Sequence, residues 1–271
     1  MTRAASLQAA PAERRLRLLS CNILAGASVQ RYSEYVTRSI NAVLPGRSKM
    51  DNLDRLAEML PQFDVIGLQE ADAGSLRSGF LNQTRYLAET AGMPYWCHQP
   101  NRAMARLSHT ANGLISRLEP HSVLDYPLPS RIPGRGALLA QFGEGEGALA
   151  VMIAHLSLSA PARLRQLGFI AELLQDFPHA VLMGDLNTEP DSAEMRHLFN
   201  KCSLQPPAES TLTFPSWKPR RALDHILTSA AIRLERRWAL PQAFSDHLPL
   251  AADIRLPAHV GGKASARRRH Q

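Results

Sequence analysis

Several short apolar stretches of this 271-residue sequence end in side chains that bind metal ions or transfer protons. LMGDLN ends in Asp185 and Asn187, and MIAHL carries His155 in an otherwise apolar run. Other stretches supply further polar residues: Asn22, Glu70, Asp224, Asp246 and His247. Taken singly, each has a structural explanation, such as an Asx turn at Asp185 or a hydrogen-bonded core histidine at His155. Their recurrence at separate strand ends instead favours one reaction centre.

Oxygen ligands form the first chemical group in this set. Hard divalent cations such as Mg²⁺ prefer carboxylate and carboxamide oxygens and keep several waters. Glu70, Asp246 and Asn22 supply such oxygens, and the sequence has no His/Cys cluster with zinc spacing. We therefore expect a Mg²⁺ site in which Mn²⁺ is a substitute. A metal held in this way polarises a phosphoryl oxygen as a Lewis acid.

Proton-transfer groups form the second chemical group in this set. Asp185 has the character of a base acting on water, while His155 and His247 are candidate hydrogen-bond donors or general acids. Asp224 is a candidate to hold one imidazole by its second nitrogen. Gly184 would leave room for a phosphate at the strand end. Because the sequence lacks a Ser or Cys nucleophile motif, a P-loop and a GxGxxG motif, hydrolysis of a phosphoester by activated water is the simplest chemistry that uses every member.

The elements that must position these residues are mostly short strands. Apolar runs predict strands at 16–23, 64–70, 110–117, 137–142, 148–158, 180–186, 222–229 and 247–256. Helical periodicity predicts helices over 50–60, 80–92 and 161–177. Strands far outnumber helices, so we expect two packed sheets with helices outside rather than one doubly wound sheet.

Residues 24–49 separate the first strand from the first of these helices. Tyr32, Tyr35, Val36 and Ile40 recur at helical spacing, which predicts an amphipathic helix on a long connection. Because the segment follows a strand end that carries a candidate site residue, the helix would either pack plainly on the surface or cap a substrate pocket.

The motifs SCNI, GLQE, AHLSL, GDLN, LDHI and SDHLPL occur in the order seen in the endonuclease/exonuclease/phosphatase superfamily, which includes DNase I. The resemblance runs from about residue 16 to residue 256. It implies an α/β fold, a four-layer sandwich of two packed, mostly antiparallel sheets flanked by helices, with the site at one rim. The expected domains are a flexible basic tail (1–15), the catalytic domain (16–258) and a second flexible basic tail (259–271).

The resemblance also implies roles on the metal and water side of the site. Glu70 matches the principal metal ligand, with Asn22 and Asp246 around the metal. Asp185 matches the residue that orients or deprotonates the attacking water, and Asn187 matches its positioning partner.

Roles on the phosphate side follow from the same resemblance. His155 matches a phosphate-contacting acid, His247 the histidine that contacts the scissile phosphate, and Asp224 the acid that orients it. Asn112 in TANGLISR matches a polar strand residue near the pocket, where we expect it to contact substrate. Arg135, which lies between two glycines, is our candidate for a phosphate or headgroup contact. Every core motif is present, which argues against a catalytically dead relative.

The net charge of +7 does not select a substrate, because it belongs to the ends of the chain. Residues 1–17 carry four arginines against one glutamate, and residues 263–271 carry four basic residues, so the charges of the remainder balance. Such tails either bind a polyanion, whether nucleic acid or an anionic lipid surface, or act as solvated ends. Three scattered cysteines and the lack of a long apolar run predict a cytoplasmic protein without a transmembrane segment.

The expected function is therefore a Mg²⁺-dependent phosphoesterase that hydrolyses a phosphodiester by direct attack of water. Two substrate classes stay open: nucleic acid, cut by an endo- or exonuclease, and a phospholipid or glycolipid/inositol-type headgroup. A third alternative is a non-catalytic phosphate-binding module on the same fold. No protein partner can be inferred.

Overall fold

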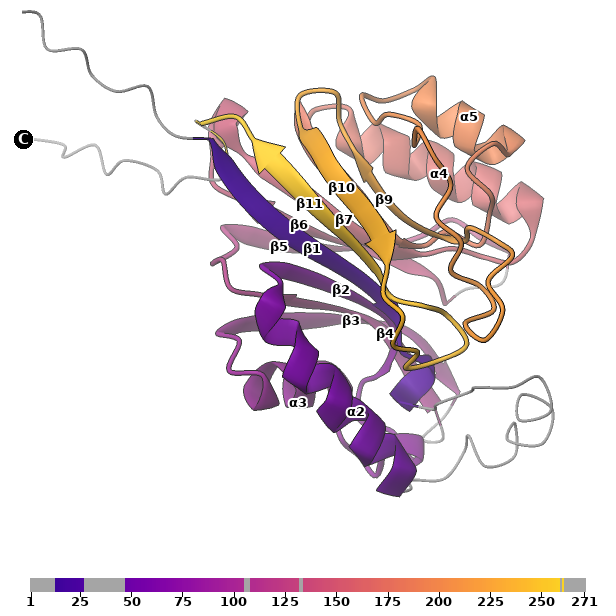
Figure 1. Ribbon diagram of the computed structural model, residues 1–271. Helices are drawn as coiled ribbons and strands as arrows, with labels where there is room; N and C mark the ends of the chain where they lie inside the picture. The colour runs from indigo at the N-terminus through magenta and orange to yellow at the C-terminus, as the bar shows by residue number, and fades with distance from the viewer. Residues whose placement is uncertain (1–12, 27–46, 105–107, 132–133, 259, 261–271) are drawn as a thin grey trace, which may run out of the picture.

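The computed structural model describes residues 13–26, 47–104, 108–131, 134–258 and 260, and two β-sheets form its centre (Figure 1). The first sheet contains β1 (Arg14–Asn22), β2 (Val65–Asp72), β3 (Tyr95–Met104), β4 (Ser108–Ser116), β10 (Arg233–Ala239) and β11 (Leu250–Leu256). The second contains β5 (Ser122–Pro127), β6 (Gly136–Phe142), β7 (Leu149–His155), β8 (His179–Asp185) and β9 (Asp224–Thr228). Their spatial orders are β10-β11-β1-β2-β4-β3 and β5-β6-β7-β8-β9.

Each sheet has one parallel pair among antiparallel neighbours. β1 pairs in parallel with β2, and β7 pairs in parallel with β8. Every residue of β7 and β8 is buried, as expected of central strands covered on both faces. The predicted sandwich of mostly antiparallel sheets is confirmed, with the qualification that both sheets are mixed.

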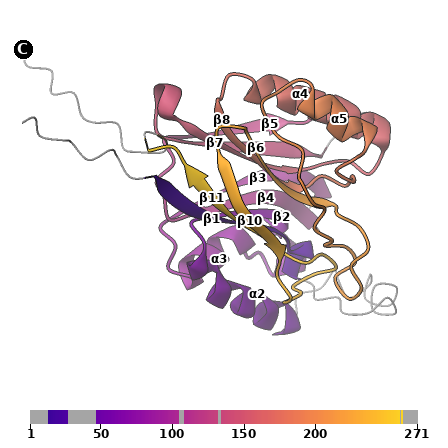
Figure 2. The same cartoon turned by 45° about the horizontal axis from the view of Figure 1, so that its top comes forward.

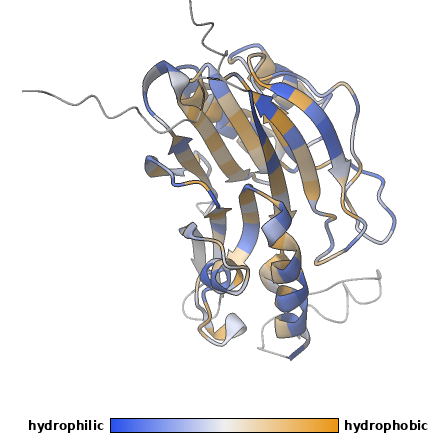
Figure 3. Cartoon of the chain, turned by 60° about the vertical axis from the view of Figure 1, so that its left-hand side comes forward, coloured by the Kyte–Doolittle hydropathy of each residue, from blue (hydrophilic) through white to orange (hydrophobic). Residues whose placement is uncertain are grey.

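Helices cover the outer face of each sheet, which gives the layers seen in Figures 1 and 2. The helices are α2 (Arg47–Met59) and α3 (Gln83–Thr90) on the first sheet, and α4 (Ala160–Leu174) and α5 (Ala193–Phe199) on the second. Leu53 and Leu87 pack with strand residues of the first sheet, whereas Leu167 and Met195 pack on the second. A third apolar cluster, including Leu18 and Ile153, fills the space between the sheets. Figure 3 shows the hydrophobic residues concentrated on the strands.

Three strands were not predicted, and all three lie at sheet edges. β5 and β10 are largely half-buried or exposed, and β10 reads RLERRWA, so neither shows an apolar run. β3 contains Pro100 at a shift of register against β4. The seven-residue α5 was also missed.

Several predicted boundaries moved. The helix expected at 50–60 begins at Arg47, and most of the amphipathic helix expected over 24–49 falls in 27–46, outside the described residues. β1 begins at Arg14, so Arg14 and Arg15 belong to the sheet rather than to the tail expected over 1–15. Residues 1–12, 259 and 261–271 of the two expected tails are outside the described part of the chain. Within that part, no helix has both the length and the apolar character needed to cross a membrane.

The strand directions bring the candidate residues to one end of the sandwich. β1, β2, β7 and β8 carry candidate residues at or near their carboxyl ends, and β9 begins beside the end of β8, with Asp224 paired to Asp185. The opposite end of β1, at Arg14, pairs with Leu256, so the first and last strands of the chain are adjacent there, away from the candidate site.

Candidate active site

Glu70 reaches the site from an irregular point of β2. The pairing of β2 with β4 shifts register between Leu68 and Ala71, and Glu70 has a φ of 56° in the left-handed region that non-glycine residues rarely adopt. Its side chain is 26% exposed, unlike its buried neighbours. Backbone strain of this kind persists where the surrounding structure imposes it, often at functional sites. The bulge thus turns one carboxylate of a buried strand toward solvent.

Asn22 joins the two sheets at this end. Its Nδ2 donates to Asp185 Oδ2 at 3.2 Å and lies 3.5 Å from Glu70 Oε1. Its Oδ1 accepts from the backbone N of Leu24 at 3.2 Å. Asn22 and Glu70 come from the first sheet, and Asp185 comes from the second. The amide nitrogen therefore holds two carboxylates of different sheets close together.

Asp185 is buried at the end of β8, where it forms an Asx turn that also includes Asn187. Its Oδ1 accepts from the backbone N of Asn187 at 3.0 Å, which is an Asx turn. Asn187 has a φ of 53°, and its Nδ2 donates to Leu156 O at 3.0 Å, so the turn is fixed to the segment after β7. Burial, together with the charges of Asp224 and Glu70, raises the pKa of Asp185, while nearby His247 opposes that shift.

Gly184 lies where β7 and β8 approach each other closely. It has a φ of 146°, and a Cβ built there would lie 1.9 Å from the carbonyl oxygen of Ala154 on β7. The glycine is therefore required by the close approach of β7 and β8, and the expectation that it also leaves room for a phosphate stays a prediction.

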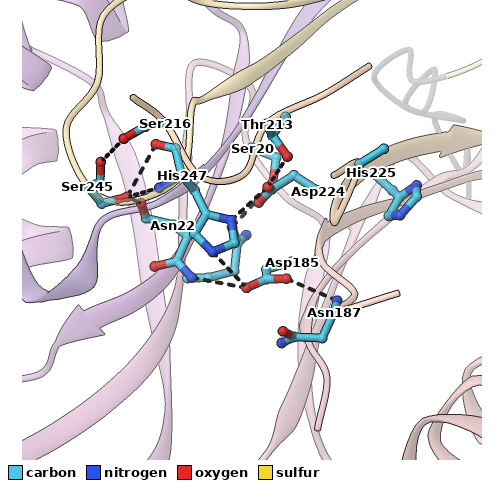
Figure 4. A network of polar contacts seen from close by, with 12 residues as sticks. Ser20, Asn22, Asp185, Asn187, Thr213, Ser216, Asp224, His225, Ser245 and His247 are labelled. Carbon is cyan, nitrogen blue, oxygen red and sulfur yellow. Dashed lines mark hydrogen bonds and ion pairs between the residues drawn. The ribbon is translucent and has the colours of Figure 1, made fainter. Parts of the chain in front are cut away.

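His247 is held as a donor by a carboxylate (Figure 4). Its Nδ1 lies 2.8 Å from Asp224 Oδ2, which also accepts from Thr213 Oγ1 at 2.6 Å. Its Nε2 lies 3.7 Å from Asp185 Oδ2. Burial of the ring lowers its pKa, but the charges of Asp224 and Asp185 outweigh burial, so the pKa of His247 is raised and the imidazolium form is favoured.

His155 has the opposite environment. Its Nδ1 lies 2.7 Å from an Arg135 guanidinium nitrogen, and its Nε2 lies 3.4 Å from Asp185 Oδ2 and 3.8 Å from Glu70 Oε1. Burial and the positive charges of Arg135 and His247 place the pKa of His155 well below its ordinary value. The surroundings thus favour a neutral ring for His155 and the imidazolium form for His247.

Asp246 and Asn112 lie around this group. Asp246 is buried, and its pKa is raised by burial and by the charges of Glu70 and Asp224, although His247 opposes the shift. Asn112 is fully buried and lies behind Arg135: its Nδ2 donates to Gly136 O at 2.8 Å and to Gln99 Oε1 at 3.2 Å. Both of its donor hydrogens are thereby used within the protein, and the prediction that it contacts substrate stays a prediction.

Two further residues that support the site were not predicted from the sequence. Thr213 hydrogen-bonds the carboxylate that holds His247, although it lies eleven residues before Asp224. Ser245 donates to Asn22 O and accepts from the backbone N of His247 at 3.0 Å. Ser245 immediately precedes Asp246-His247 and could have been noticed there, whereas nothing in the sequence pattern marks Thr213.

The site has the donor set that a hard divalent cation requires. Glu70, Asp185, Asp224 and Asp246 bring four carboxylates together, and mutual repulsion contributes to the raised pKa of Asp185 and of Asp246. A buried oxygen, Asp224 Oδ1, has no hydrogen-bond partner.

Two groups of residues could hold such an ion. Asp185, Asp224 and His247 offer ligand atoms within 4.8 Å of one another. However, Asp224 and His247 are already joined by a hydrogen bond and the pKa of His247 favours a bound proton, so Glu70 and Asp246 of the predicted group suit a cation better, whereas Asn22 directs its amide nitrogen toward Glu70 and Asp185. In either case, the residues present fit a divalent metal ion.

Comparison with known proteins identifies the family and supports the fold. The family described as Endonuclease/Exonuclease/phosphatase family matches residues 19–247. A search of curated proteins found no match.

Solved structures share the fold at low sequence identity. An endonuclease/exonuclease/phosphatase family protein from Bacteroides thetaiotaomicron has a TM-score of 0.68 at 17% identity, covering 90% of this chain and 99% of that one. The mannosyl-6-phosphatase Bt3783 from Bacteroides thetaiotaomicron VPI-5482 has a TM-score of 0.64 at 17% identity, covering 88% and 99%. ANGEL2, a 2′,3′-cyclic phosphatase, has a TM-score of 0.65 at 15% identity, covering 90% and 96%.

Proposed function

The chain belongs to the endonuclease/exonuclease/phosphatase family, and from this we propose that it is a Mg²⁺-dependent phosphoesterase that hydrolyses a phosphodiester by direct attack of water. The observation that carries the proposal is that two histidines with opposite partners, Asp224 and Arg135, converge on the carboxylate of Asp185. His247 is favoured as a cation and His155 as a neutral ring, and Asp185 lies within 3.7 Å of both. Pairs of titratable groups whose environments separate their pKa values are typical of acid–base sites.

The residues of the chain divide the reaction between them. Asp185 accepts a proton from water as the water oxygen bonds to phosphorus. His247, held by Asp224, stabilises the negative phosphoryl oxygens and supplies a proton to the ester oxygen as its bond to phosphorus breaks. His155 donates a hydrogen bond from its neutral ring. A divalent cation held by Glu70 and Asp246, with Asn22 beside it, would supply Lewis-acid polarisation of the phosphoryl group.

A nucleic acid is the first substrate class that we propose. The four basic residues of the C-terminal tail, together with Arg3 near the N-terminus, would recruit a polyanion, and Arg135 adds a positive charge beside His155. Recruitment can be separated from turnover by deleting residues 1–12 and 261–271, which leaves β1 and β11 intact. We expect weaker binding to DNA or RNA in this truncated chain and unchanged turnover of a small phosphate ester.

A lipid headgroup is the second candidate, favoured by apolar side chains on the loops that leave the site. Leu158 and Phe80 are 77% and 66% exposed, more than any other exposed large hydrophobic among the described residues. They follow β7 and β2, the strands that carry His155 and Glu70. Exposed apolar side chains beside a polar site are typical of contact with a lipid surface.

An activity panel tests these proposals together. Purified chain with Mg²⁺ or Mn²⁺ is offered single- and double-stranded DNA, RNA, sphingomyelin and phosphatidylinositol vesicles, and small esters including a sugar phosphate and a 2′,3′-cyclic phosphate. Asp185→Ala is the inactive variant, and Asp176→Ala, an exposed carboxylate after α4, is the matched control.

Each result of the panel decides one point. Turnover by the wild type and Asp176→Ala but not by Asp185→Ala supports the phosphoesterase. Equal turnover by all three chains contradicts the proposed site. Substrate binding without any turnover would favour the non-catalytic phosphate-binding module. Lower lipid turnover in Leu158→Ser and Phe80→Ser, with small esters unaffected, would select the lipid candidate.

A further inference from the structure

The two site histidines differ in what faces their Nδ1 atoms. His247 Nδ1 lies 2.8 Å from a carboxylate oxygen of Asp224, whereas His155 Nδ1 lies 2.7 Å from the Arg135 guanidinium. A guanidinium has donors and no acceptor. A hydrogen bond between Arg135 and Nδ1 therefore requires Nδ1 to be the acceptor, which leaves the ring proton of neutral His155 on Nε2.

The other end of the ring selects the same tautomer. His155 Nε2 lies 3.4 Å from Asp185 Oδ2 and 3.8 Å from Glu70 Oε1. With the proton on Nε2, the N–H points toward two carboxylates. With the proton on Nδ1, the N–H would face a guanidinium and the Nε2 lone pair would face the carboxylates, so both ends would be repulsive. The ring is 3% exposed, which leaves water little access to screen either contact.

Buried amides hold the segment that carries Arg135. The carbonyl of Arg135 accepts from Leu128 N at 2.9 Å, and the carbonyl of the next residue, Gly136, accepts from Asn112 Nδ2 at 2.8 Å. Gln99 Nε2 donates to Ala137 O at 3.1 Å, and Gln99 and Asn112 are hydrogen-bonded to each other. Two amides of the first sheet thus fix the beginning of β6 in the second sheet, where Arg135 leaves the backbone.

We infer that Arg135 is a positioning residue that holds His155 as the Nε2–H tautomer, so that a neutral N–H points toward Asp185 and Glu70, where the phosphoryl oxygen of the substrate would bind. This assignment departs from the expectation that Arg135 contacts phosphate or a headgroup itself. Its catalytic consequence rests on the proposed phosphoesterase function, whereas the tautomer is a property of the chain alone. Asn112 and Gln99 serve the same purpose through the backbone of β6.

Imidazole ¹⁵N spectra of the full chain test the tautomer without any substrate. The His155 signals are assigned by their disappearance in His155→Gln. We expect a protonated Nε2 and an unprotonated Nδ1 in the wild type and in Arg135→Lys, which keeps a donor. In Arg135→Met, which has none, the two tautomers should mix. Arg131→Met, an exposed arginine of the same loop, is the control and should match the wild type.

Kinetics on a substrate found in the activity panel add a second measurement. Arg135→Met should lower kcat about 10- to 100-fold with KM little changed, as is typical when an outer partner of a site histidine is lost, and Arg135→Lys should restore part of kcat. A wild-type His155 protonated on Nδ1 would overturn the inference, as would an unaltered tautomer in a folded Arg135→Met. If Arg135→Met does not fold, the wild-type and Arg135→Lys spectra still decide. If no substrate is ever turned over, the proposed function fails while the spectra still answer for Arg135.

Discussion

Replacing Asp224 by Asn removes a charge from the site with little change of shape. Asp224 is buried, and its Oδ2 accepts from Thr213 and lies 2.8 Å from His247 Nδ1. An asparagine can keep one of these contacts, but it can also turn its amide nitrogen toward His247. The ring would then lose the charge that favours its cation and the acceptor that fixes its tautomer.

The size of the effect follows from the separation. At an effective dielectric constant of about 20, opposite charges at the 2.8 Å of this pair attract by about 6 kcal/mol before burial of the ring is counted. If half of that is expressed as His247 stabilises the transition state, kcat falls about 10²-fold. KM should change little, because the interaction strengthens as charge develops on the phosphate.

The assay is steady-state kinetics of Asp224→Asn, with Asp176→Asn as the matched change at an exposed site. The free energy of unfolding of each variant is measured in urea, so that a loss of folded protein is not mistaken for a loss of chemistry. A folded Asp224→Asn with kcat within threefold of the wild type would refute the reasoning about His247. A higher KM at unchanged kcat would assign Asp224 to substrate binding instead.

Four further predictions follow from single features of the chain. Asp185→Ala should lower kcat by at least ~10³-fold, measured against Asp176→Ala, as for a member of a concerted catalytic unit. Chelation with EDTA should abolish turnover and Mg²⁺ or Mn²⁺ should restore it, and full activity in EDTA would contradict the metal proposal. Gly184→Ala should destabilise folding by more than about 2 kcal/mol in urea, because its Cβ would lie 1.9 Å from Ala154 O, whereas Gly92→Ala, where a Cβ meets nothing within 4 Å, should cost less. His225 is buried with its Nε2 against Thr188 O, and burial lowers its pKa, so the unfolded chain takes up a proton that the folded chain does not. The free energy of unfolding should therefore fall as pH drops below about 6.5, by up to about 1.4 kcal/mol per pH unit. His225→Gln should flatten this slope in urea melts.

The sequence predicted the central strands well because burial on both faces leaves a continuous apolar run. β7 and β8 are buried at every position, and their apolar runs predict both strands. The edge strand β10 was missed because its charged side chains lie on an outer surface: Arg236 stacks over Trp238 with its guanidinium carbon 4.4 Å from the ring centroid. A strand that pairs on one side only can carry charged side chains, so it does not form a continuous apolar run.

The residues of the site could be predicted from the sequence, but the contacts between them could not. The polar residues at strand ends were visible because each interrupts an apolar run. The contacts of Arg135 with His155 and of Thr213 with Asp224 join residues eleven or more positions apart, and their chemistry depends on distances that no spacing reveals. Asn112 is also a polar residue in an apolar strand, but its side chain hydrogen-bonds the backbone of the opposite sheet.

The site exists only because two sheets meet at a close distance. Asn22 of the first sheet reaches Asp185 of the second at 3.2 Å, and this requires the strands behind them to pack with little between. Gly67 on β2 supplies that room, since a Cβ there would lie 2.9 Å from both Ile153 and Met183 of the opposite sheet. Ile153 and Met183 lie two residues before His155 and Asp185, so the packing of the core directly sets where these site residues stand. A glycine in a buried strand thereby allows the sheets to pack closely enough to bring the carboxylates and histidines of both sheets together.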